Sequence, residues 1–258
     1  MEILGYVGAL FIGLVLGLTG GGGSILTVPI LVYLMNINPV TATAYSLFIV
    51  GTTSTFGAIQ NYRKNLVDIK NGFIFAIPSF VAVYLTRKYI VPRIPEIIVE
   101  SPILITKNTF LMLFFAIIMI FGALSVLKKK SQDNTNEEKR NLIFIGIQTF
   151  SIGIIIGFVG AGGGFLIIPS LILFAKLPMK KAVGTSLFII AMNSLVGFIG
   201  DVQNLEIDWQ FLLTFSAISV AGIFLGMYLT KYTNESQLKK IFAYFVLVMA
   251  AIILLKEM

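Results

Sequence analysis

The 258-residue sequence contains no cysteine and no histidine. Without cysteine, the chain can form no disulfide, no thiol relay and no thiolate metal site. Without histidine, it lacks the most common general base and the most common metal ligand, so an intramembrane serine protease is disfavoured. We therefore expect neither an enzyme nor a protein that carries a metal ion or any other cofactor.

Charge is also scarce. Charged residues make up 12% of the chain, hydrophobic residues make up 57%, and the mean hydropathy is +0.94, whereas soluble domains carry roughly twice that share of charge. Apolar segments run at about 3–18, 24–35, 40–60, 71–86, 108–127, 141–158, 165–175, 182–199, 209–230 and 237–255. This pattern predicts an all-α polytopic protein whose surroundings are a lipid bilayer. The net charge of +7 does not predict a nucleic-acid partner, because Lys and Arg are concentrated between the apolar segments.

What the chain does have is a glycine-rich pattern that occurs twice, 140 residues apart, inside apolar sequence. The first copy contains Gly20, Gly21, Gly22, Gly23 and Ser24, and the second contains Gly160, Gly162, Gly163 and Gly164. Such a run interrupts a helix and leaves backbone groups without helical partners, which lipid tolerates only where protein buries them or a polar cavity adjoins them. Paired breaks of this kind indicate the substrate site of a transporter built from repeats.

The two halves of the chain are predicted to be repeats. At an offset of 140, 17 of the 50 residues in 12–61 are identical to their counterparts in 152–201. The polar, charged stretch 128–140 separates an N-terminal membrane repeat, 1–127, from a C-terminal one, 141–258. The similarity weakens after about residue 70, and we assign residues 87–107, which include an insertion in the first half, to a loop.

The distribution of basic residues predicts the topology. Segments 24–35 and 165–175 would form helices of about 18 and 16 Å, too short for a hydrocarbon core of roughly 30 Å. If each glycine run folds back as a broken hairpin, 14 of the 19 basic residues fall on one side of the membrane. The positive-inside rule then places 128–140 in the cytoplasm and both termini outside. Each half becomes a glycine-broken hairpin followed by three transmembrane helices, and the halves are inverted in the cell membrane.

The breaks are predicted to bind a small anion at the membrane midplane. The first N–H groups of the short helix after each glycine run have no intrahelical acceptor and lie at the positive end of the helix dipole. Hydroxyl and amide side chains recur one helix later with the same spacing, at Ser46, Thr53 and Ser54 and at Ser186, Asn193 and Ser194. One break is too weak to bind a fully dehydrated anion, whereas two facing breaks, together with these side chains and some retained water, are compatible with binding one. The spacing Gly13-xxx-Gly17, by contrast, is more typical of helix packing.

These residues resemble the TauE/SafE family, the sulfite and organosulfonate exporters. The pattern G-x-x-G-x-G-G-G is matched by residues 157–164, and residues 17–24 match it with Ser24 in the last place. The pattern after each break is also similar, as Ala182-Val-Gly-Thr-Ser186 and Ala42-Thr-Ala-Tyr-Ser46. The resemblance covers essentially the whole chain and implies export of small sulfur-containing anions. The absence of cysteine separates the chain from related thiosulfate-uptake proteins.

Two alternatives remain beside an exporter. An anion channel or facilitator for another small anion could use the same breaks, whereas a membrane scaffold would leave the paired breaks unexplained. We find no carboxylate within the spans to carry a coupling proton, and Asp201, near the end of a span, is the best candidate outside them. Neither the oligomeric state nor the coupling ion follows from the sequence.

Overall fold

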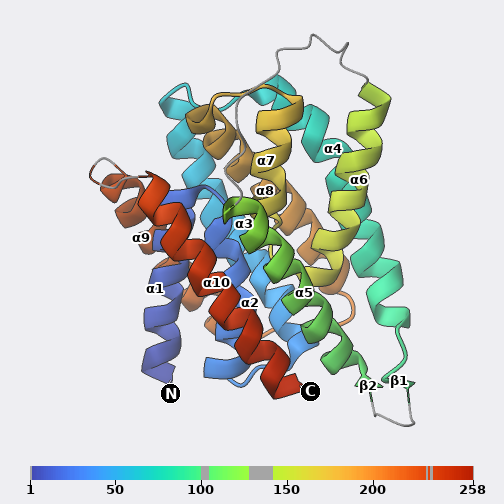
Figure 1. The fold of residues 1–258 in the computed structure, drawn as a ribbon. Helices are drawn as coiled ribbons and strands as arrows, with labels where there is room; N and C mark the ends of the chain where they lie inside the picture. Colours follow the sequence, from blue (N-terminus) through green and yellow to red (C-terminus); the bar gives the residue numbers. More distant parts are fainter. Residues whose placement is uncertain (1, 100–104, 128–141, 231, 233–234, 258) are drawn as a thin grey trace.

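The computed structural model describes residues 2–99, 105–127, 142–230, 232 and 235–257, which form a helical bundle (Figure 1). The expected linker 128–140 lies outside these residues. The predicted all-α class of membrane protein is therefore confirmed, with one local exception. In the segment assigned to a loop, strands β1 (Ile97–Val99) and β2 (Ile105–Thr106) pair antiparallel.

The first half begins with a helix, a glycine-rich break and a short return arm. Its elements are α1 (Glu2–Thr19), the 3₁₀-helix η1 (Gly22–Leu26), α2 (Thr27–Pro29), the π-helix η2 (Ile30–Leu34), α3 (Pro39–Arg63), α4 (Ile69–Leu85), the π-helix η3 (Thr86–Ile90), the 3₁₀-helix η4 (Val91–Arg93) and, after the strands, α5 (Lys107–Leu127). The return arm 22–34 is about 20 Å long, too short to cross the membrane alone.

The second half repeats this order with a single short helix after the break. Its elements are α6 (Leu142–Val159), α7 (Gly164–Phe174), α8 (Met179–Asp201), α9 (Trp209–Leu229) and α10 (Glu235–Glu257). Four helices of the described chain are long and apolar enough to span a membrane: Ile69–Arg93, Lys107–Leu124, Met179–Asp201 and Trp209–Leu229. The two ends of the chain lie at the same end of the bundle (Figure 1).

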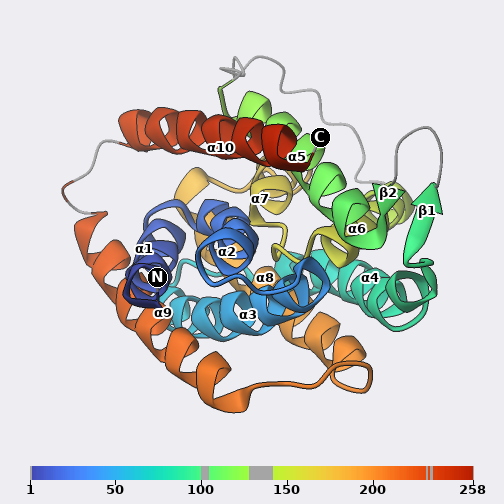
Figure 2. The same cartoon turned by 90° about the horizontal axis from the view of Figure 1, so that it is seen from below.

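The helices of the two halves pack in crossed pairs. Helix α1 packs on α9, α6 packs on α4, and α3 packs against α8 between these pairs. Helices α5 and α10 pair with each other on one side of the bundle (Figure 2). Glycines permit the close contact of α1 with α9, because a Cβ at Gly13 would overlap the carbonyl oxygen of Ser219 and one at Gly222 would overlap that of Leu10. The expected packing role of the glycine spacing is therefore confirmed.

The N-termini of α4 and α9 are fixed by equivalent hydrogen bonds. Asp68 and Asp208 cap these helices, and each carboxylate accepts a hydrogen bond from the amide of the third helical residue, at 2.9 and 3.0 Å. The backbone amide of Asp68 donates to Thr185 Oγ1 at 2.9 Å, and that of Asp208 donates to the hydroxyl of Tyr45 at 2.7 Å. Because Tyr45 and Thr185 are 140 residues apart, as are the two aspartates, equivalent positions make reciprocal contacts between the halves.

Candidate functional site

Both long hairpin helices end at a glycine in the left-handed conformation. Gly20 follows α1 with φ 74° and Gly160 follows α6 with φ 69°. Their amides donate to the carbonyl oxygens of Leu16 and Ile156, each at 2.8 Å. Side chains rarely adopt this backbone conformation, so these two positions favour glycine. The predicted breaks therefore begin where the sequence pattern places them.

The two breaks meet backbone to backbone inside the bundle. A Cβ built on Gly21 would lie 2.6 Å from the Cα atom of Gly164, and one built on Gly164 would overlap Gly21. Residues 20–24 and 160–164 are all buried. No side chain of either glycine-rich segment therefore separates Gly21 from Gly164, and the structure brings together two segments that are far apart in the sequence.

The short arms after the breaks begin close to the predicted positions, but they differ in form. In the second half, α7 begins directly at Gly164. The amides of Leu166 and Ile167 donate to the carbonyl oxygen of Gly163, at 2.9 and 3.0 Å, whereas those of Gly164 and Phe165 have no acceptor within the helix. In the first half, a 3₁₀-helix begins at Gly22, and the Gly22 amide donates to Thr19 Oγ1 at 3.0 Å. The Ser24 hydroxyl donates to the Gly21 carbonyl oxygen at 2.7 Å. The first break thus uses part of its own hydrogen-bonding capacity.

The predicted polar side chains of α3 and α8 are all fully buried. These residues are Ser46, Thr53, Ser54, Ser186, Asn193 and Ser194. Ser186 lies against the first break, where its hydroxyl donates to the Gly20 carbonyl oxygen at 2.6 Å. Ser194 lies beside the second break, since a Cβ on Gly162 would be 3.0 Å from its Oγ. Asn193 instead faces α4, and its Oδ1 accepts from Ser79 Oγ at 2.7 Å.

Four of these hydroxyl groups have no hydrogen-bond partner within the described part of the chain. They are Ser46 Oγ, Thr53 Oγ1, Ser54 Oγ and Ser194 Oγ. Buried polar groups are normally satisfied by protein, water or a ligand. The central helices therefore hold hydrogen-bonding capacity that the described residues leave unused, and one of these groups, Ser194 Oγ, lies next to the second glycine break.

A buried ion pair lies beside the second break, and sequence reasoning missed its cation. The expected loop at 87–107 begins instead as η3, which continues α4 and buries Arg87 completely. Arg87 Nη1 lies 3.3 Å from Asp201 Oδ2 at the end of α8 and donates to Thr43 Oγ1 at 3.0 Å. A span predicted from hydropathy alone ends before the first charged residue, which here is Arg87. The helical period gave only a partial signal, because Arg87 follows the apolar residues Ala76 and Val83 by eleven and four positions and so lies on their face of the helix, which is buried.

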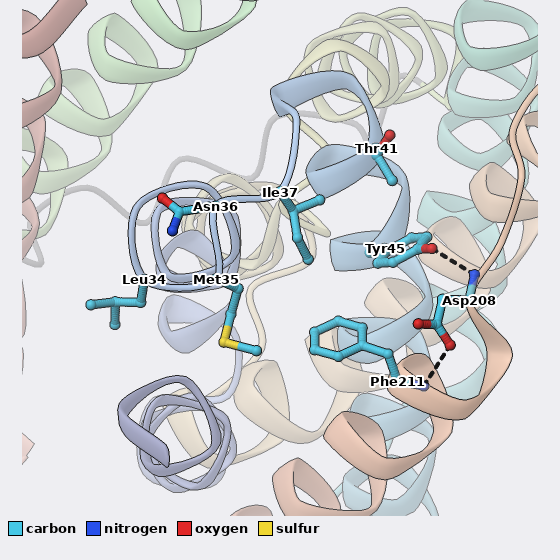
Figure 3. Close-up of a pocket in the computed structure, with 8 residues that line it drawn as sticks. All are labelled: Leu34, Met35, Asn36, Ile37, Thr41, Tyr45, Asp208 and Phe211. Carbon is cyan, nitrogen blue, oxygen red and sulfur yellow. Dashed lines mark hydrogen bonds between the residues drawn. The ribbon is translucent and has the colours of Figure 1, made fainter. Parts of the chain in front are cut away.

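A cavity of about 510 Å³ opens near the start of α3 (Figure 3). The turn after the first hairpin, residues 34–37, forms one wall, and Asp208 and Phe211 at the start of α9 form another. Tyr45 lies between these walls and accepts a hydrogen bond from the Asp208 amide. Tyr33, just before this turn, donates to Glu257 Oε1 at 3.1 Å. The cavity therefore lies at the end of the bundle that contains the termini.

Comparison with known proteins gives one family across almost the whole chain. A sequence profile described as "Sulfite exporter TauE/SafE" matches residues 6–253. A "Probable membrane transporter protein" of Xylella fastidiosa (strain 9a5c) is 27% identical over 246 residues, which cover 93% of this chain and 89% of the relative. The "Probable membrane transporter protein YdhB" of Bacillus subtilis (strain 168) is 28% identical over 229 residues and 86% of each chain. No solved structure matches.

Proposed function

Since this chain belongs to the sulfite exporter TauE/SafE family of membrane transporters, we propose that it exports small sulfur-containing anions, such as sulfite or an organosulfonate. The observation that carries this proposal is the meeting of the two glycine breaks at Gly21 and Gly164. The anion is bound between these breaks, near the middle of the bundle. This contact leaves no room for an anion in the conformation described, so binding requires that the two hairpins separate.

The chemistry of the breaks suits an oxyanion. A helix dipole contributes roughly 0.3–2 kcal/mol to the binding of an anion at its N-terminus, and each hydrogen bond to a charged group contributes about 1.5–3 kcal/mol. The amides of Gly164 and Phe165 at the start of α7 and the buried, unpartnered hydroxyls of Ser46, Thr53, Ser54 and Ser194 are the donors proposed for the anion. Together with water that the anion retains, these groups offset the cost of dehydration, which a single break cannot offset.

We further propose that residues 1–127 and 141–258 are inverted repeats. The crossed packing of α1 on α9 and α6 on α4 supports this arrangement, as do the reciprocal hydrogen bonds made by Asp68 and Asp208. Inverted repeats allow alternating access, because each hairpin can move against the opposite half around a central site. With the basic stretch 128–140 in the cytoplasm, both termini lie outside the cell.

The test is sulfite flux in liposomes that contain purified protein, with sulfate, taurine, sulfoacetate and chloride as competitors. We expect saturable flux that organosulfonates inhibit, because a carrier has a finite number of sites. A current that grows in proportion to voltage and shows no saturation would identify an anion channel instead. Folded protein that carries none of the sulfur anions would contradict the proposed function.

A further inference from the structure

Arg87 has more hydrogen-bond donors than the described residues satisfy. Its side chain is fully buried, and an arginine carries five N–H donors. Nη1 donates to Thr43, whereas Nε and Nη2 have no partner within the described residues. The nearby Asp201 Oδ2 forms an ion pair at 3.3 Å but likewise has no hydrogen bond there. Such unsatisfied capacity around a buried cation indicates that acceptors are added from elsewhere.

The guanidinium group lies directly against the second glycine break. A Cβ on Gly160 would be 2.6 Å from Arg87 Nη2 and 2.7 Å from the Cβ of Thr43. A Cβ on Gly200, in the last turn of α8, would be 3.1 Å from the Cβ of Arg87. Glycine at 160 therefore leaves the unpartnered Nη2 in direct contact with the backbone of the break.

The first break has no such charge. The counterparts of Thr43, Arg87 and Asp201, found at the same offset of 140 residues, are Val183, Met227 and Asn61. Val183 lies against Gly20, as Thr43 lies against Gly160, and the backbone of Met227 lies against Gly17. The Asn61 amide donates to the carbonyl oxygen of Gly57 in its own helix. The two breaks thus begin with the same left-handed glycine, Gly20 and Gly160, but among the described residues a buried cation lies beside the second break alone.

We propose that Arg87 is the cationic anchor of the anion site and that Asp201 is a resident counter-ion that the transported anion displaces. This inference rests on the proposed function. A sulfite or sulfonate group presents three oxygen acceptors, which match the unpartnered donors of the planar guanidinium. Asp201 ends α8, and residues 202–204 after it are exposed. The released carboxylate can therefore turn toward water while the anion takes its place.

The decisive variant gives the second break the residues of the first. Arg87→Met combined with Asp201→Asn copies Met227 and Asn61 and leaves no unpaired buried charge, so we expect a folded, inserted protein. Its KM for sulfite should rise roughly 10- to 100-fold, as expected for lost hydrogen bonds to a charged ligand. Lys88→Met, which removes the adjacent positive charge, is the matched control and should keep the wild-type KM. An unchanged KM in the double variant would overturn the proposal.

Single substitutions give effects of opposite sign that a purely structural ion pair would not produce. Arg87→Lys keeps the charge but loses the planar fork, so it should raise the KM for sulfite. Asp201→Asn removes the competing carboxylate, so it should lower the KM. Weaker sulfite binding in both variants would mean that the pair only stabilises the fold, and would overturn the anchor role.

Binding of sulfite and of taurine to purified protein, followed by calorimetry, separates this inference from the proposed function. If the wild-type protein carries sulfite and Arg87→Lys binds it equally well, the anchor is wrong and the transporter stands. If the wild-type protein neither carries nor binds either anion, both proposals are wrong. Weaker binding to Arg87→Lys than to the wild type supports the anchor.

Discussion

At the residue scale, glycine acts in two ways in this bundle. At Gly13 and Gly222 the missing Cβ lets α1 and α9 touch along their backbones. At Gly162 two constraints act together, because φ is +64° and an added Cβ would lie 2.8 Å from Val50 Cγ1 and 2.9 Å from Ile190 Cγ2. The second kind of position is sensitive to substitution even by alanine.

We predict that Gly162→Ala lowers both stability and sulfite flux. A left-handed conformation costs a non-glycine residue about 1–2 kcal/mol, and the added methyl also pushes against Val50 and Ile190. The melting temperature in detergent should fall by several degrees, and the flux per folded molecule should fall further. The control is Gly146→Ala in α6, where nothing lies within 4 Å of the added Cβ. Wild-type flux in folded Gly162→Ala would contradict this prediction.

At the element scale, the contacts that fix the starts of α4 and α9 come from the opposite half. The amide of Asp68 is held by Thr185 in α8, and that of Asp208 is held by Tyr45 in α3. Each helix is thus capped by its own aspartate and tied to the other half by one hydroxyl group. Loss of either hydroxyl should loosen the contact between the halves.

We therefore predict that Thr185→Val and Tyr45→Phe each destabilise the protein by about 1 kcal/mol, the usual net contribution of one hydrogen bond. Thermal unfolding in detergent would show a melting temperature lower by a few degrees for both. Thr185→Ser keeps the hydroxyl and should unfold close to the wild type. Equal melting temperatures for Thr185→Val and Thr185→Ser would show that the hydrogen bond contributes little.

Most helix boundaries could be predicted because local signals define them. The apolar segments at 71–86 and 209–230 end within a few residues of α4 and α9, and Asp68 and Asp208 mark their starts. Arg87 could not be placed in the same way, because its burial depends on Asp201 and Thr43, which come from distant parts of the chain. Hydropathy measures only how strongly a residue's own side chain prefers water and takes no account of its tertiary partners. A span predicted from hydropathy therefore ends before the first charged residue.

The site was predictable in part for the same reason. A glycine run identifies a break from the sequence alone, but the meeting of Gly21 with Gly164 depends on tertiary packing. Two residues of the periodic polar spacing, Ser186 and Ser194, lie next to the breaks in the structure. Asn193 shares that spacing but faces Ser79 of α4, because neighbouring positions on a helix point in different directions.

At the scale of the whole molecule, the proposed topology can be tested directly because the chain has no native cysteine. Lys64 and Gln203 are exposed in loops that follow α3 and α8, and the proposed inversion places these loops on opposite sides of the membrane. We predict that a membrane-impermeant maleimide labels Gln203→Cys in intact cells, whereas Lys64→Cys is labelled only after lysis. Labelling of both from the same side would contradict the inverted arrangement.

The crossed pairing of α1 with α9 also affects how the protein is made. Helix α1 ends at Thr19 and α9 begins at Trp209, so the ribosome must add about 190 residues before α1 meets its partner. At a translation rate of 5–20 residues per second, α1 spends roughly 10 to 40 s in the bilayer before synthesis of α9 begins, and its glycine-containing face is uncovered during that time. The rate of translation therefore sets how long this face is open to other membrane proteins during biogenesis.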